Sequence, residues 1–72
     1  MVNVNKLKAK LVELGTNVDE LTSKIEMSRD TFYRRLASDG QTFTIKEVDE
    51  ICRELKLSKN EVNEIFFSQF VG

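Results

Sequence analysis

The 72-residue sequence has no histidine, no proline, no tryptophan and a single cysteine, Cys52. Without histidine there is no imidazole for acid–base catalysis or metal ligation. One cysteine cannot form an intrachain disulfide, so nothing indicates a disulfide-stabilised secreted domain. The sequence also lacks a Gly-rich phosphate loop and clusters of metal ligands. We therefore expect a non-enzymatic protein without metal or cofactor.

Long apolar runs are missing as well, since the longest covers only the three residues 65–67. A membrane-spanning helix needs about 20 mostly apolar residues, and the core of a signal peptide needs about 7–15. The sequence predicts neither of them, so the expected location is the cytoplasm.

The residues that are present suit one globular domain over residues 1–72, because 40% are hydrophobic and 32% are charged. The absence of proline and the presence of only three glycines disfavour a β-rich fold with many tight turns. Helices are favoured, and we expect an all-α fold.

Charge is unevenly distributed along the chain, although the formal net charge is only −1. Residues 1–36 hold seven Lys and Arg against five Asp and Glu, a net +2. Residues 37–72 hold four against seven, a net −3. This asymmetry indicates a basic binding face formed by the first half of the chain. Lys6, Lys8 and Lys10 are spaced around the first predicted helix, so we expect them to be mainly solvated.

Apolar residues recur with a helical period in five segments. In the first, Leu7, Leu11 and Leu14 fall on one helix face, and Gly15 follows where a helix end favours a left-handed residue. In the others, a capping residue marks the start of the helix. The predicted helices lie near residues 5–14, 17–25, 28–37, 44–56 and 58–67.

Capping residues open the last four predicted helices. Asn, Ser or Thr at an N-cap accepts a hydrogen bond from the first turn, and Glu at N3 can return one. Apolar residues on both sides of a cap can staple the first turn, as Met27 and Phe32 would around Ser28. The predicted caps are Asn17, Ser28, Thr44 and Ser58, with Glu20, Glu47 and Glu61 at N3 of the first, third and fourth.

Only Glu26 and Met27 link the second predicted helix to the third. So short a link forces a sharp angle between the two helices and excludes an antiparallel hairpin. A short helix, a tight turn and a second helix opened by Ser28 are typical of a helix-turn-helix, here with its core at residues 17–37.

The segment NVDELTSKIEMSRDTFYRRL, residues 17–36, resembles the helix-turn-helix of the Cro and repressor family, the XRE-like class. The resemblance is carried by DELT at 19–22, by Met27-Ser28 at the end of the turn, and by the recognition helix at 29–36. The flanking segments KLKAKLVELG and KEVDEICRELKLSKNEVNEIFF are similar to small Cro-position and modulator-of-repression regulators of Gram-positive temperate phages. The resemblance covers nearly the whole chain and implies a compact five-helix domain.

Three positions depart from the family pattern. Thr22 replaces a small Ala, and fits if its hydroxyl bonds back to its own helix. Glu26 replaces the Gly of the turn, so a non-glycine residue is expected in a left-handed conformation that costs roughly 1–2 kcal/mol. Val18 stands where a polar residue often contacts phosphate.

The third predicted helix should turn Phe32 and Leu36 inward and present its other face to a ligand. In a helix-turn-helix the first residues of this helix meet base edges in the major groove. Arg29 suits guanine O6 and N7, Asp30 suits cytosine N4, and hydroxyls and amides at the helix starts suit phosphate oxygens. The predicted DNA-contacting residues are Asn17, Ser28, Arg29, Asp30, Thr31, Tyr33, Arg34 and Arg35. The alternative is a solvated surface on which Asp30 and Arg34 form an ion pair.

Two further surfaces are candidates for protein contacts. Glu47, Glu50 and Glu54 line one side of the fourth predicted helix, and could engage a basic protein surface or simply face solvent. They should face away from an apolar stripe formed by Ile45, Val48, Ile51 and Leu55.

The second surface lies in the association tail, residues 65–72. Val62, Ile65 and Phe66 can turn inward, but Phe67 points elsewhere and, with Phe70 and Val71, is a candidate exposed patch for a dimer or partner contact. The alternative is that Phe70 folds back over a small core.

The resemblance implies a phage-type transcriptional regulator that binds a double-stranded DNA operator as a dimer in a genetic switch. The alternative is a modulator of repression that binds the phage repressor protein and alters its occupancy of DNA. A homodimer, operator DNA and a repressor protein are therefore the expected partners, whereas a membrane and a small-molecule substrate are not.

Overall fold

The computed structural model describes residues 2–68 of the chain. Within these residues the prediction of an all-α fold is confirmed, because they form five α-helices and no strand. The helices are α1 (Val4–Glu13), α2 (Val18–Lys24), α3 (Arg29–Ala37), α4 (Ile45–Leu55) and α5 (Lys59–Phe66). They match the predicted segments to within one residue at each end, and the last four predicted ranges begin at the N-cap residue.

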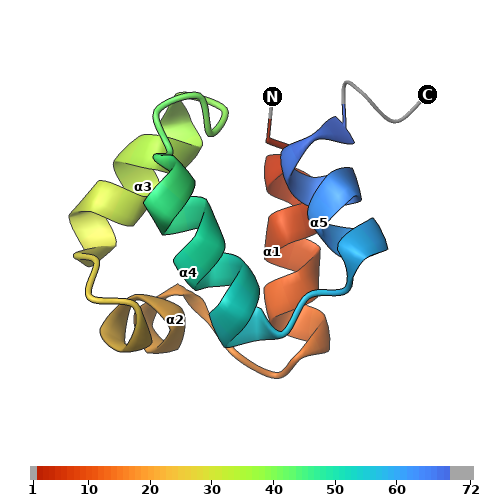
Figure 1. The fold of residues 1–72 in the computed structure, drawn as a ribbon. Coiled ribbons are helices and arrows are strands. Elements are labelled where there is room, and N and C mark those ends of the chain that lie inside the picture. Colours follow the sequence, from red (N-terminus) through yellow and green to blue (C-terminus); the bar gives the residue numbers. More distant parts are fainter. Residues whose placement is uncertain (1, 69–72) are drawn as a thin grey trace.

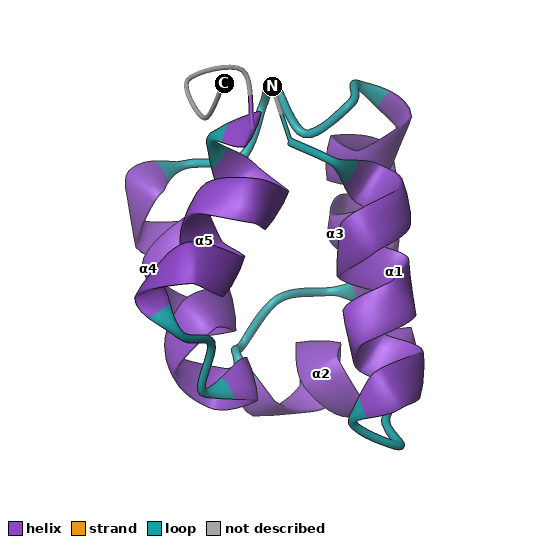
Figure 2. Ribbon diagram, turned by 90° about the vertical axis from the view of Figure 1, so that its right-hand side faces the viewer, coloured by secondary structure: helices purple, strands orange, loops and turns teal. Residues whose placement is uncertain are grey.

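The helices pack around one core, with α1 beside α5 and with α2 against both α3 and α4. In Figures 1 and 2, α2 lies at one end of the domain. The start of α1, the end of α5 and the α3–α4 connection lie at the other end. The first and last helices are also joined through the backbone, since the Asn3 amide donates to the Ile65 carbonyl at 2.6 Å.

The core draws on all five helices. Its largest fully buried side chains are Leu7, Leu21, Phe32 and Ile51, from α1 to α4, and α5 adds Ile65 and Phe66, as predicted. At roughly 1.5–3 kcal/mol for each fully buried large apolar side chain, these residues provide most of the drive to fold.

The predicted caps are confirmed, because the side chains of Asn17, Ser28, Thr44 and Ser58 each accept a hydrogen bond from the N3 backbone amide. Full capping boxes form at Thr44 and Ser58. At Asn17, however, the Glu20 carboxylate instead accepts a hydrogen bond from the Thr16 hydroxyl. Asn3 caps α1 in the same way and explains why that helix begins one residue earlier than expected.

Two residues expected on buried stripes are exposed, so these predictions are wrong. Leu14 is 45% exposed because α1 ends at Glu13 and Leu14 is its C-cap, where the helical period stops. Ile45 is 91% exposed because it occupies the first position of α4, before the part of the stripe that enters the core. The rest of the α4 stripe is buried at Ile51 and Leu55 and half-buried at Val48.

Candidate nucleic-acid interface

The connection between α2 and α3 turns sharply through Glu26, which has a φ of 55°. The Met27 amide donates to the Thr22 carbonyl at 3.4 Å, the six-to-one hydrogen bond of a Schellman helix end. The expectation that a non-glycine residue takes the left-handed conformation here is confirmed. Ser28 then caps α3 immediately, so the two helices are held at a fixed angle.

Thr22 fits its position in the way expected of a threonine that replaces alanine. Its side chain is 6% exposed, and its hydroxyl donates to the Val18 carbonyl at 2.8 Å. The buried oxygen therefore has a partner inside its own helix. The close approach of α2 to α3 and α4 does not leave an unsatisfied polar group.

One face of α3 is buried and the other is exposed, as predicted. Phe32 is 0% exposed and Leu36 is 8% exposed, with Met27 half-buried beside them. The opposite face carries four predicted DNA-contacting residues, all of them exposed: Arg29, Asp30, Tyr33 and Arg34. The ion pair between Asp30 and Arg34, which belonged to the alternative interpretation of a solvated surface, does not form within the described residues.

Arg29 is held by two neighbours on this face. Its Nε lies 3.2 Å from an Asp19 carboxylate oxygen on α2, and its guanidinium lies 5.6 Å from the centroid of the Tyr33 ring. An exposed ion pair of this kind contributes at most about 1 kcal/mol. A base edge or a phosphate can therefore displace Asp19 at small cost.

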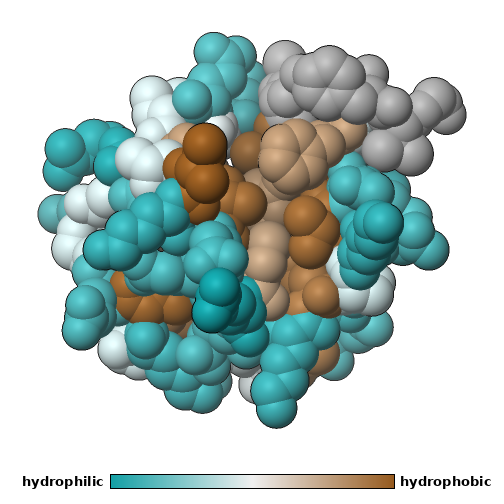
Figure 3. All heavy atoms as spheres, in the orientation of Figure 1, coloured by the Kyte–Doolittle hydropathy of each residue, from teal (hydrophilic) through white to brown (hydrophobic). Residues whose placement is uncertain are grey.

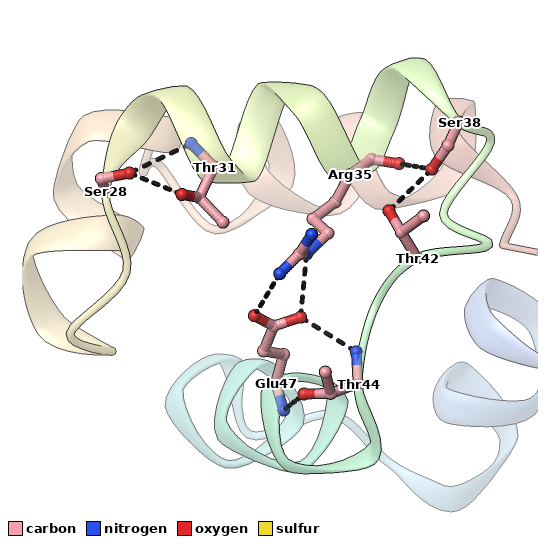
Figure 4. A network of polar contacts seen from close by, with 7 residues as sticks. All are labelled: Ser28, Thr31, Arg35, Ser38, Thr42, Thr44 and Glu47. Atoms are coloured by element: carbon pink, nitrogen blue, oxygen red, sulfur yellow. Dashed lines mark hydrogen bonds and ion pairs between the residues drawn. The ribbon is translucent and has the colours of Figure 1, made fainter.

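Arg35 does not lie with the other arginines. It points toward α4, where its Nε and Nη2 donate to the two carboxylate oxygens of Glu47, both at 3.1 Å (Figure 4). Glu47 also accepts from the Thr44 amide at 2.9 Å, and Arg35 is the main cause of the lowered pKa of Glu47. Arg35 therefore fixes α3 to the start of α4.

Ser28, Thr31 and Asn17 use their side chains to build helix starts. The Ser28 hydroxyl accepts from the Thr31 amide at 3.1 Å and donates to the Thr31 hydroxyl at 2.8 Å (Figure 4). The Asn17 side chain accepts from the Glu20 amide at 2.9 Å. Their contact with phosphate stays a prediction.

The acidic stripe on α4 is not a set of free carboxylates. Glu47 pairs with Arg35. The Glu50 carboxylate lies 3.9 Å from the Lys46 ammonium group, and the Glu54 carboxylate lies 3.8 Å from the Lys24 ammonium group. Each member of the predicted stripe therefore has a basic neighbour, which reduces its attraction for a basic protein surface.

Lys10 was expected to be mainly solvated, but its side chain is only 13% exposed. Its ammonium group donates to the Glu61 carboxylate on α5, and a second pair joins Lys6 to Glu64 at 3.5 Å. The hydrogen bond from Lys10, helped by the Ser58 amide, holds the pKa of Glu61 at about 2. The sequence could have predicted this burial, because Lys10 follows Leu7 by three residues and so lies beside the buried stripe of the helix.

The remaining predictions concern the cysteine, metals, membranes and the tail. Cys52 is half-buried, and burial raises the pKa of its thiol. Residues 2–68 contain no cluster of three or more potential metal ligands, and no helix among them is long and apolar enough to cross a membrane. Phe67 is 44% exposed, as expected, whereas Phe70 and Val71 lie outside the described residues.

Comparisons of the chain with protein-family models, with curated protein sequences and with solved structures found no match.

Proposed function

We propose that this chain is a non-enzymatic transcriptional regulator of the helix-turn-helix Cro and repressor class. It binds operator DNA as a dimer, one copy to each half-site, in the genetic switch of a phage within the bacterial cytoplasm. The observation that carries the proposal is the exposed arginine-bearing face of α3, which follows the sharp left-handed turn at Glu26.

The side chains on this face suit the major groove. Arg29, at the first position of α3, can present two donors to guanine O6 and N7, and Tyr33 supports its guanidinium from one turn further on. Arg34 makes no ion pair with any residue of 2–68, so it is available for a second base or a phosphate. In this proposal Arg35 is a positioning residue, because it holds α3 against α4 through Glu47.

The test is a binding assay on DNA selected from a random duplex library, followed by titration of the selected site. Arg29→Ala should weaken specific binding by roughly 1–3 kcal/mol and relax the preference at one base pair. Lys8→Ala is the matched control, since Lys8 is exposed on α1 and makes no ion pair within residues 2–68. Failure of the chain to select any sequence at low salt would overturn autonomous operator binding.

A modulator of repression is the second candidate, favoured by the mixed charge of the same surface. The helix-turn-helix segment that carries the arginines also carries exposed acids, with Asp19 and Glu20 on α2, Glu26 in the turn and Asp30 on α3. With a net charge of −1, such a surface can also fit a basic repressor surface. Coexpression with a repressor protein and size-exclusion chromatography, with and without operator DNA, separates the two functions.

A further inference from the structure

An apolar groove of about 360 Å³ opens between the start of α4, the end of α5 and the α3–α4 connection. Phe43, Ile45, Val48, Phe66 and Phe67 are among its lining residues. Figure 3 shows hydrophobic residues gathered on the face of the molecule that carries α4 and α5. Ile45 and Phe67 are 91% and 44% exposed, so two large apolar side chains border the groove without cover from residues 2–68.

We propose that this groove is the docking site of the C-terminal segment of the same chain, residues 69–72, with the ring of Phe70 as its anchor. The inference goes beyond the DNA-binding function and does not depend on it. It also chooses between the two roles that the sequence leaves open for Phe70.

The length of the chain allows this docking. Phe67 itself lines the groove, and Phe70 follows three residues later. Three extended residues span at most about 11 Å, and a bend shortens that distance, so the Phe70 ring can enter a groove that begins at Phe67. The segment reads Gln-Phe-Val-Gly and carries no charged side chain, so its burial does not require the desolvation of an ionised group.

The groove is also suited to an aromatic ring. Phe32 and Phe43 meet edge to face with ring centroids 5.8 Å apart, and Phe43 and Phe66 do so at 6.4 Å. This series of rings runs from the core to the groove wall. A further ring placed there can meet Phe43 and Phe66 in the same favourable geometry.

A second copy of the chain fits the groove less well. A stable protein interface takes about 20–30 residues from each partner, whereas eight of residues 2–68 line this groove, and Val2 and Phe66 among them are already buried. The groove therefore matches one or two side chains better than a protein surface. A tethered segment also acts at a millimolar effective concentration, which a free second copy does not reach in a dilute solution.

Thermal unfolding of the 72-residue chain tests the contact by a double-mutant cycle. Phe70→Ala should lower the Tm by roughly 4–8 °C in the native background, but by much less when Ile45→Ala has already removed one wall of the groove. Val12→Ala is the matched control background, since Val12 is 78% exposed and does not line the groove. Equal losses from Phe70→Ala in all backgrounds, or no loss in any, would overturn the proposal.

NMR identifies the occupant directly. Nuclear Overhauser effects are expected between the Phe70 ring and the methyl groups of Ile45 and Val48, with chemical shifts that do not change with protein concentration. Effects seen only between labelled and unlabelled chains of a mixed sample would instead assign the groove to a second copy. Absence of any effect from the Phe70 ring to these methyl groups would also reject the docking.

Discussion

Single residues with left-handed backbone conformations fix the connections of this domain. Five such residues lie within 2–68, namely Gly15, Glu26, Asp39, Gly40 and Lys56. The left-handed conformation of Glu26 is unfavourable for a non-glycine residue, but the Schellman hydrogen bond before Ser28 and the Ser28 cap stabilise the turn on both sides. Gly40 differs from the others, because its neighbourhood as well as its backbone excludes a side chain.

Gly40→Ala should destabilise the fold much more than Gly15→Ala. Both glycines have positive φ values, 75° and 68°, so each substitution carries the left-handed penalty of roughly 1–2 kcal/mol. A Cβ at Gly40 would in addition overlap the Val2 side chain, whereas a Cβ at Gly15 meets no atom within 4 Å. Overpacking of this kind costs a further ~1–3 kcal/mol. Chemical denaturation of the two variants measures the difference, and equal losses would show that Val2 moves away freely.

Helices were predictable from the sequence because their signals are local. The caps at Thr44 and Ser58, with their Glu partners at N3, involve residues only three positions apart. The exposure of Ile45 and the inward turn of Arg35 depend instead on which helices pack beside them, and no periodicity contains that information. The same limit explains why Arg29 and Arg35 could be placed on α3, whereas their partners Asp19 on α2 and Glu47 on α4 could not be predicted.

Contacts between helices also give the fold a pH dependence that involves Glu61. Its pKa is lowered from 4.5 to about 2 by the hydrogen bond from Lys10. A carboxyl group with a lowered pKa in the folded state stabilises the fold fully above its unfolded pKa, and this stabilisation is lost as the pH falls through the folded value. The contribution of Glu61 should therefore be complete at pH 7 and disappear between about pH 4.5 and pH 2.

The variant Glu61→Gln tests this dependence, because glutamine keeps an acceptor for the Ser58 cap but cannot ionise. Urea unfolding at several pH values should show the native chain losing more stability than the variant between pH 4.5 and pH 2. Glu64→Gln serves as the control, because Glu64 also pairs with a lysine of α1, with its carboxylate 3.5 Å from the Lys6 ammonium group, but both side chains of that pair are exposed. Parallel losses in the native chain and in Glu61→Gln would contradict the role of Glu61.

At the scale of the whole molecule, the charge asymmetry of the sequence serves largely to join the two halves of the chain. Four ion pairs each connect a base from residues 1–36 to an acid from residues 37–72. The net positive charge of the first half is therefore not concentrated on one face of the molecule. These pairs are Lys6–Glu64, Lys10–Glu61, Lys24–Glu54 and Arg35–Glu47. Of the seven bases in the first half, Lys8, Arg29 and Arg34 remain outside this set. Within the first half, any affinity for DNA must therefore rest mainly on Arg29 and Arg34, the two exposed arginines of α3.

Salt dependence separates the two candidate partners. A dimer that contacts several phosphates should lose orders of magnitude in operator affinity between ~50 and ~200 mM salt. A wholly apolar contact with a repressor protein, through the Phe-rich end of the chain, would respond little to salt. We expect the DNA-type response, since Arg29 and Arg34 are exposed on a single helix face.

Charge reversal in the acidic stripe then distinguishes electrostatic binding to DNA from electrostatic binding to a repressor protein. Glu50→Lys together with Glu54→Lys should leave operator affinity unchanged or higher, because the change adds positive charge to a protein that is proposed to bind the polyanion DNA. Docking of the stripe on a basic repressor surface would be abolished by the same double change. Circular dichroism controls for the fold, since the new lysines lie close to Lys46 and Lys24. Repressor binding that survives the reversal would exclude the stripe as its contact, and weakened operator binding by a folded variant would contradict the proposed approach to DNA.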